Sequence, residues 1–352
     1  MIKKKIGSKN NFRNKLPNYN PRYNFDNFIV GDNNNFAWNA AKRVSMFSQT
    51  IFNPLFIYGE TGLGKTHLIQ AIAHEAKRTW KKSNIEYLSC EELLNLYIGA
   101  VQNDKISDFR NRFKKVDMVL IDDIQSLAAK TKTLKEFLYI FKVLYNSNKQ
   151  IVLTSDKSPS KIEYFSTNLI SYFEHRLIAE IKPPTFETRL TILKNKRKSL
   201  GIKINIKILS FIADKISSNV RRLEEALIRL SAYSSITGRE ITMHRAKYQL
   251  YPFIKQEEKT NTSIDLIQKK VAEYYDLNVN DLTLSNSNKR ITYPQMVAIY
   301  LSKEMTYASL SEIGKTFRST SNKTIIKSIN KIRKERANAF KIDNLISEII
   351  LS

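Results

Sequence analysis

Residues 59–66 constrain this chain more than any other stretch, because they read Gly-Glu-Thr-Gly-Leu-Gly-Lys-Thr. The octet fits G-x-x-x-x-G-K-[ST], the pattern of a phosphate-binding loop. The apolar run at 55–58 predicts a buried strand before the loop, and the apolar spacing within 67–77 predicts a helix after it. Strand, glycine-rich loop and helix are the context that the pattern requires, so the sequence predicts a P-loop.

The residue types of this octet suit a nucleoside triphosphate. Several backbone N–H groups must converge on the phosphate oxygens, and glycines without Cβ atoms let the loop curl closely around them. The helix that follows directs its positive end at the phosphates. Lys65 would neutralise the β- and γ-phosphates, and the hydroxyl of Thr66 would ligate Mg²⁺. We therefore predict that ATP is bound by Gly59, Gly62, Gly64, Lys65 and Thr66.

Two further apolar stretches end in acidic residues that would complete such a site. The stretch 116–123 predicts a central parallel strand that delivers Asp122 and Asp123 to the C-terminal edge of a sheet. We expect Asp122 to hold Mg²⁺, directly or through water, and Asp123 to polarise the attacking water. Asp123 is one methylene shorter than a Glu, which predicts slow hydrolysis. Asp156, after the predicted strand 150–155, is either a sensor of the γ-phosphate or a plain strand exit.

The domain organisation follows from the order of the predicted elements. Strands alternate with helices up to about residue 185, which predicts a parallel sheet in an α/β core. The pattern is then purely helical to residue 250, and residues 256–261 are interpreted as a charged linker. The predicted divisions are a disordered basic tail at 1–20 with no folded domain before the core, the core at 21–185, a helical lid at 186–255 and a DNA-binding domain at 256–352.

Two segments around this core keep alternative interpretations open. The aromatic residues Tyr23, Phe25 and Phe28 could pack against an adenine ring or fill the core. Asn219 can cap a helix whose first turn carries Arg221. Arg221 would then face the nucleotide from the lid, or lie on a solvated helix face.

Charge and composition indicate the class of partner. The formal net charge of +25 points to a polyanion, and nucleic acid is the first to consider. The chain has one cysteine, so it has no disulfide framework, and a reducing compartment is expected. No apolar run is long enough to span a membrane, and no signal peptide is evident, which predicts a cytoplasmic location.

The C-terminal residues carry a pattern typical of duplex DNA binding. A short predicted helix at 309–317 is followed by a polar turn and by a lysine-rich helix from 322 to 332. This predicts a helix-turn-helix whose second helix enters the major groove, although a structural helical hairpin with solvated lysines would look similar.

The order of these motifs resembles that of the DnaA family of bacterial chromosomal replication initiators, which belongs to the AAA+ class. The resemblance rests on the P-loop, on Leu-Ile-Asp-Asp-Ile-Gln at 120–125, on Leu-Thr-Ser-Asp at 153–156, on Asn-Val-Arg-Arg-Leu-Glu at 219–224 and on the basic helix-turn-helix. It implies a P-loop AAA+ core, a helical lid and an all-α DNA-binding domain, with ATP and Mg²⁺ bound. Implied partners are origin duplex, single-stranded DNA, further copies of the chain, the replicative helicase and, peripherally, acidic lipid.

The resemblance also implies which residues touch DNA. Single-strand contacts match Ile98, Lys130 and Lys132, and Lys289 and Arg290 match a segment that reaches the minor groove. The start of the recognition helix and its basic face comprise Ser321, Asn322, Lys323, Thr324 and Lys327.

Three departures from the family pattern affect the expected function. We expect no counterpart of the N-terminal interaction domain that is usual in the family. Tyr172 stands where the family has an arginine finger, and Arg176 lies four residues further on. Ser321, Asn322 and Lys323 replace Asp-His-Thr, which exchanges an acceptor for base edges with a cation that seeks phosphate. We expect DNA binding with relaxed or altered sequence preference, and weaker ATP-coupled assembly.

The sequence therefore favours an ATP-regulated replication initiator with weak ATP hydrolysis that serves as a switch. One alternative is a helicase loader without its own duplex recognition, against which the basic residues 262–352 argue. A second is a nucleotide-responsive DNA-binding or transcription regulator, which the altered finger keeps open. A metabolic P-loop kinase is least expected, because no motif for an acceptor substrate is present.

Overall fold

The computed structural model describes residues 20–46, 52–128, 131–283, 289–318 and 322–336. The chain divides into two compact units, Met1–Leu227 and Ile228–Ser352. The predicted basic tail at 1–20 lies almost wholly outside the described residues. The division into tail, core, lid and DNA-binding domain at residues 20, 185 and 255 stays a prediction.

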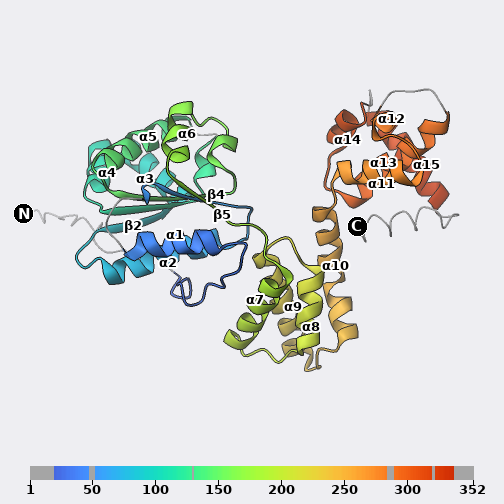
Figure 1. Cartoon of the computed structure of the whole chain (residues 1–352), viewed down its shortest axis with the longest axis horizontal. Helices are drawn as coiled ribbons and strands as arrows, with labels where there is room; N and C mark the ends of the chain where they lie inside the picture. Colours follow the sequence, from blue (N-terminus) through green and yellow to red (C-terminus); the bar gives the residue numbers. More distant parts are fainter. Residues whose placement is uncertain (1–19, 47–51, 129–130, 284–288, 319–321, 337–352) are drawn as a thin grey trace, which may run out of the picture. The chain divides into compact units, whose positions relative to one another are not determined.

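The first unit is built on a parallel five-stranded sheet with the order β2-β3-β4-β1-β5 (Figure 1). β1 pairs with β4 and β5, although it precedes both by about a hundred residues. The P-loop follows β1, so it emerges beside the end of β4. The prediction of a parallel α/β sheet is confirmed. The strands are β1 (Leu55–Tyr58), β2 (Ile85–Ser89), β3 (Met118–Asp122), β4 (Gln150–Ser155) and β5 (Leu177–Glu180).

Helices cover both faces of this sheet because successive strand side chains point to opposite sides. Leu55 and Ile57 of β1 pack with α1 (Asn35–Met46) and α2 (Lys65–Thr79) in one core cluster. Phe56 of the same strand belongs to the opposite cluster. That second cluster also receives α3 (Cys90–Gln102), α4 (Ile106–Lys114), α5 (Thr131–Asn146) and α6 (Thr167–Glu174).

Among the described residues after β5, the regular elements are all helices, as predicted. α7 (Phe186–Ser199) and α8 (Ile206–Lys215) belong to the first unit, and α9 (Val220–Thr237) crosses the division between the units. The predicted cap is confirmed, because Oδ1 of Asn219 accepts the backbone N–H of Arg222 at 2.9 Å. This bond satisfies an N–H group that the first turn of a helix leaves without a partner.

The second unit begins with the end of α9 and continues with α10 (Met243–Asn261). The predicted charged linker at 256–261 is therefore wrong, because these residues extend α10. Its Gln, Glu and Lys residues are good helix formers, and no Gly or Pro interrupts them. Among the described helices, none is long and apolar enough to cross a membrane.

The rest of the second unit is a helical domain with its own apolar core. The core contains Ile267, Val271, Leu282, Val297, Leu301 and Ile313 among others. Ser309 and Glu312 form a capping box that starts α14. The helices are α11 (Ile264–Tyr274), α12 (Val279–Thr283), α13 (Lys289–Met305), α14 (Leu310–Thr316) and α15 (Asn322–Arg336). α14 and α15 are the predicted helix-turn-helix pair.

Candidate nucleotide site and nucleic-acid interface

The P-loop connects β1 to α2, as the sequence predicts. Gly62 has φ +83° and Gly64, which caps α2, has φ +98°. Both lie in the left-handed region that side chains with a Cβ rarely adopt. A Cβ at Gly59 would lie 2.3 Å from the carbonyl oxygen of Ile181, so that position also requires glycine. The loop is thus held in a curled conformation that exposes its backbone amides.

Lys65 lies at the centre of the site and is only 6% exposed. Its Nζ donates to the carbonyl oxygens of Gly59 at 2.6 Å and Glu60 at 2.9 Å. Burial lowers the pKa of Lys65, and the nearby carboxylates of Asp123, Asp122 and Asp156 oppose this shift. The three acids predicted at the ends of two strands therefore act electrostatically on one ammonium group.

Asp122 ends β3 and is 4% exposed. Its carboxylate accepts hydrogen bonds from the hydroxyls of Thr154 and Tyr87, the latter at 3.3 Å, and the hydroxyl of Thr66 also acts on it. Burial raises the pKa of Asp122, while the hydroxyls of Thr154 and Thr66 lower it. The paired oxygens of Thr66 and Asp122 are hard donors of the kind that Mg²⁺ takes from a protein when phosphates complete its shell.

Asp123 and Asp156 lie beyond the ends of β3 and β4. The N–H of Asp123 donates to Oγ1 of Thr154 at 2.9 Å, and its own φ is +58°. Nε2 of Gln125 donates to Oδ1 of Asp123 at 3.2 Å, and Oε1 of Gln125 accepts the N–H of Asp156 at 3.3 Å. Within the described part of the chain, the buried Oδ1 of Asp156 has no hydrogen-bond partner. An acceptor in this state suits a group that bonds to a ligand.

Sequence reasoning missed three polar residues that organise these acids, namely Tyr87, Thr154 and Gln125. Tyr87 lies in β2 and accepts a hydrogen bond from Nε2 of Gln70 at 3.0 Å while donating to Asp122. Thr154 could have been found as a polar residue that directly follows the apolar run 151–153 of its strand. Gln125 carried no signal beyond its place two residues after Asp123.

Arg221 is on the first turn of α9, which contacts the P-loop. The backbone N–H groups of Val220 and Arg221 donate to the carbonyl oxygen of Gly62 at 3.0 and 3.3 Å. The charge of Arg221 contributes to lowering the pKa of Lys65, so its exposed guanidinium acts on the same site. The structure thus favours the nucleotide-facing interpretation over a distant solvated face.

The aromatic residues before α1 adjoin the P-loop helix. Phe25 and Phe28 are buried in the sheet core, which favours core filling for these two. Tyr23 stacks on the ring of His67 with centroids 4.9 Å apart, and Phe28 meets that ring edge-on at 5.2 Å. Nε2 of His67 lies 2.8 Å from the carbonyl oxygen of Asn24. Tyr23 is half-buried, so of these three aromatic residues it is the one whose ring is open to contact with an adenine base.

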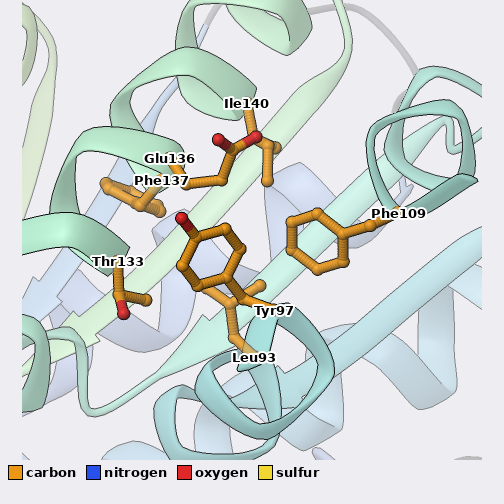
Figure 2. Close-up of a pocket in the computed structure, with 7 residues that line it drawn as sticks. All are labelled: Leu93, Tyr97, Phe109, Thr133, Glu136, Phe137 and Ile140. Atoms are coloured by element: carbon orange, nitrogen blue, oxygen red, sulfur yellow. The ribbon is translucent and has the colours of Figure 1, made fainter. Parts of the chain in front are cut away.

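α3 presents Ile98, which is 42% exposed, on a rigidly supported helix. Its inner residues Leu93 and Tyr97 converge with Phe109 of α4 and with α5, as Figure 2 shows. Glu136 of α5 lies in the same cluster and forms an ion pair with Arg110, in which Oε1 of Glu136 lies 2.7 Å from Nε of Arg110. Lys132 is exposed in the first turn of α5, and Lys130 lies outside the described residues.

α15 has a polar outer face and an apolar inner face. Ile325, Ile329 and Ile332 are buried in the core of the second unit. Ser321 lies outside the described residues, and Lys289 and Arg290 begin α13 with side chains that are likewise outside the description. The predicted DNA-binding residues that the structure places on the exposed face are Asn322, Lys323, Thr324 and Lys327.

Tyr172 of α6 is part of an aromatic cluster. Its ring meets Phe141 edge-on at 5.5 Å and Tyr145 at 5.0 Å. Arg176 is exposed, and its Nη2 donates to the hydroxyl of Tyr145 at 2.8 Å. The position expected to hold a cation is therefore occupied by a packed ring, with an arginine bound to the neighbouring tyrosine.

These features define a P-loop nucleotide-binding protein of the AAA+ class joined to a helix-turn-helix unit. Residues 19–180 match the model of the bacterial DnaA ATPase domain, and residues 264–332 match the bacterial DnaA helix-turn-helix. The chain is 43% identical to the chromosomal replication initiator protein DnaA of Geotalea uraniireducens over 94% of its own length and 74% of that protein's. It belongs to the bacterial DnaA family.

Two solved structures extend this similarity to the fold. The crystal structure of domain III of the Thermotoga maritima replication initiation protein DnaA is 39% identical, with a TM-score of 0.65, over 67% of this chain and 99% of that one. A replication initiator DnaA bound to AMPPCP and single-stranded DNA is 31% identical, with a TM-score of 0.62, over 94% of this chain and 97% of that one.

Proposed function

We propose that this chain is an ATP-regulated chromosomal replication initiator, which binds duplex DNA at the origin, oligomerises and helps to open the duplex. The observation that carries this proposal is the combination in one chain of three acids around Lys65 with a basic recognition helix, α15. Its DnaA relatives are named chromosomal replication initiators.

ATP fits the residues that surround Lys65. The P-loop glycines let the loop curl while it packs closely against Ile181 and Asn219, and Lys65 would exchange its carbonyl partners for phosphate oxygens. Mg²⁺ would be held by Thr66 and Asp122, where it would neutralise charge on the β- and γ-phosphates. Asp156 and Arg221 supply an acceptor and a cation that could distinguish ATP from ADP.

Slow ATP hydrolysis would act as the switch. Asp123 lies beside Asp122 and would polarise the attacking water, while Asp122 stays with the metal. A shift of populations between assembled and free chains requires contacts that differ between ATP and ADP. The γ-phosphate contacts of Asp156 and Arg221 would provide that difference.

DNA would be bound by surfaces on both units. The exposed face of α15 would enter the major groove, with Lys289, Arg290 and Ser321 completing the duplex contacts. Ile98, Lys130 and Lys132 would follow a single strand, because an exposed apolar side chain can contact bases and lysines can track phosphates.

Further partners belong to the same proposal. They are other copies of the chain, the replicative helicase and an acidic lipid surface contacted peripherally. We also propose a cytoplasmic location, and a division into core, lid and DNA-binding domain at residues 185 and 255.

The proposal is tested by fluorescence anisotropy on a duplex that carries a consensus initiator box and on a scrambled duplex. With ATP, binding of the box duplex should be stronger than with ADP by about 5- to 150-fold, the usual range for a coupled ligand. Lys65→Ala should lose this nucleotide dependence and retain basal duplex binding. Equal affinities with ATP, with ADP and without nucleotide would overturn the ATP-regulated initiator.

The packing of Tyr172 favours one second candidate, a nucleotide-responsive DNA-binding regulator that does not assemble. Such a protein would respond to ATP on DNA yet sediment as a single species in both nucleotides. Absence of turnover, with or without DNA, would favour it further.

A further inference from the structure

Gln125 connects two residues that the proposed reaction needs at different strand ends. It lies in the 3-10 turn Ile124–Leu127, which begins directly after Asp123. Its amide nitrogen donates to Oδ1 of Asp123 at 3.2 Å, and its amide oxygen accepts the backbone N–H of Asp156 at 3.3 Å. One half-buried amide therefore joins the end of β3 to the end of β4.

The carboxylate of Asp123 depends on this amide for its orientation. Its backbone is fixed by the bond to Thr154 and by a left-handed conformation, but its side chain makes no capping bond to the turn that follows. A carboxylate held only by its backbone can rotate about two side-chain torsions. The bond from Gln125 selects one of these orientations.

We propose that Gln125 is a positioning residue, which orients the carboxylate of Asp123 and couples it to the backbone of Asp156. This inference rests on the proposed ATP hydrolysis. Gln125 acts through Asp123 and Asp156 and is not a catalytic residue. If binding of the γ-phosphate displaces Asp156, the amide transmits that displacement to Asp123.

The chemistry requires an amide of this length. An amide has a donor and an acceptor. If the Gln125 amide were flipped, its NH2 group would face the backbone N–H of Asp156, and its oxygen would face the carboxylate of Asp123. Neither pair could form a hydrogen bond. A glutamate could still accept from Asp156 but would repel the Asp123 carboxylate. A methionine has a similar length and makes neither bond, and an asparagine is one methylene too short to reach both groups.

The test compares Gln125→Glu and Gln125→Met with the wild type, with Ser126→Ala, at an exposed position of the same turn, as the matched control. Calorimetric titration gives the Kd for ATP and for ADP, steady-state hydrolysis gives kcat, and thermal unfolding reports folding. Both variants should lose about 10- to 100-fold in kcat, the scale for a misplaced reacting group. Their Kd for ADP and their Tm should match the control.

Each other result has a definite meaning. A wild-type rate in Gln125→Glu overturns the positioning role and leaves the proposed hydrolysis intact. An equal loss of ADP affinity and Tm in both variants also overturns it, because Gln125 would then be structural. A wild-type chain that binds ATP without any turnover overturns the proposed hydrolysis and this inference together.

Discussion

The hydroxyl of Thr154 links β4 to both acidic residues of the neighbouring strand end. It donates to Oδ1 of Asp122 and accepts the backbone N–H of Asp123 at 2.9 Å. Thr154 is completely buried, so neither group can exchange this bond for water. One hydroxyl therefore fixes the metal-binding carboxylate and the backbone of the acid beside it.

Thr154→Val should destabilise the nucleotide-free protein, because valine keeps the shape and removes both bonds. A buried donor and a buried acceptor would each lose a partner, at a cost of about 1–3 kcal/mol for an unsatisfied group. Differential scanning calorimetry should give a Tm lower by about 3–10 °C. Thr191→Val on the exposed surface of α7 is the matched control and should change Tm little. An unchanged Tm in Thr154→Val would show that the linkage contributes nothing to stability.

Gly62→Ala should weaken nucleotide binding through two separable effects. The left-handed φ costs an L-residue about 1–2 kcal/mol, and the new Cβ would lie 2.8 Å from Oδ1 of Asn219, the cap of α9. The cap would have to move, and with it the helix that carries Arg221.

Gly201→Ala separates the two effects, because Gly201 has φ +64° and nothing lies within 4 Å of its added Cβ. Both variants should be destabilised, but only Gly62→Ala should lose affinity for ATP. Each 1.4 kcal/mol of binding free energy lost should raise the Kd for ATP about tenfold. Calorimetric titration measures the difference. Equal ATP affinities in the two variants would mean that crowding against Asn219 does not reach the site.

The nucleotide site was largely predictable because its signals are local in sequence. The P-loop octet dictates its own turn, and the ends of parallel strands meet at one edge, so Asp122 and Asp156 had to approach Lys65. The supporting polar groups were not predictable in this way. Tyr87 reaches Asp122 because the register pairs Ser89 with Asp122, and no pattern in either strand states that register.

The error at residues 256–261 has a physical cause of a different kind. A run of charged and polar residues without apolar spacing reads as a linker, yet the Gln, Glu and Lys residues of this run have good helix propensity. Glu257 is buried in α10, which a solvated linker would not allow. Packing of a polar residue cannot be read from apolar periodicity, so the continuation of α10 was missed.

Asp117→Asn should show a pH-dependent loss of stability. Nζ of Lys149 donates to Asp117 at 2.9 Å, and together with the backbone N–H of Asn84 it lowers the pKa of Asp117 below 3.8. A lowered pKa means that the stabilisation is complete above pH 3.8 and is lost as the pH falls through the native pKa. The pair is partly exposed, so its contribution at pH 7 should be about 0.5–1 kcal/mol.

Urea unfolding at pH 7, 5 and 3.5 checks this expectation. The difference between wild type and Asp117→Asn should be the same at pH 7 and 5 and should shrink at pH 3.5. Asp214→Asn removes an exposed ion pair with the adjacent Lys215 and should show no measurable difference at any pH. If the difference in unfolding free energy between wild type and Asp117→Asn were unchanged at pH 3.5, the effect would come from hydrogen-bond geometry rather than from charge.

Lys323→Thr should weaken binding to duplex DNA and leave the choice of DNA sequence unchanged. Lys323 is exposed near the start of α15, where a cation is expected to seek phosphate. Its removal should reduce the salt dependence of log K by about one unit of slope and weaken binding to all duplexes similarly. The ratio of affinities for a consensus box and a scrambled duplex should therefore stay level. The control Lys198→Ala, at an exposed position of α7, should change neither the salt-dependence slope nor the ratio of affinities. A lower ratio in Lys323→Thr would contradict this prediction, because Lys323 would then contact a base.

Tyr172→Arg should couple assembly to ATP at some cost in stability. The wild-type chain offers no cation at residue 172, and Arg176 is held on the hydroxyl of Tyr145. Arginine would supply the cation but lose two edge-on ring contacts, each worth about 0.5–1.5 kcal/mol, so Tm should fall by several degrees. Sedimentation velocity should detect a larger increase in species size with ATP over ADP in Tyr172→Arg than in wild type, where this increase should be weak. Tyr172→Phe retains the ring and should sediment like wild type. Robust ATP-dependent oligomers in the wild type that persist in Arg176→Ala would contradict this expectation, because assembly would then require neither residue.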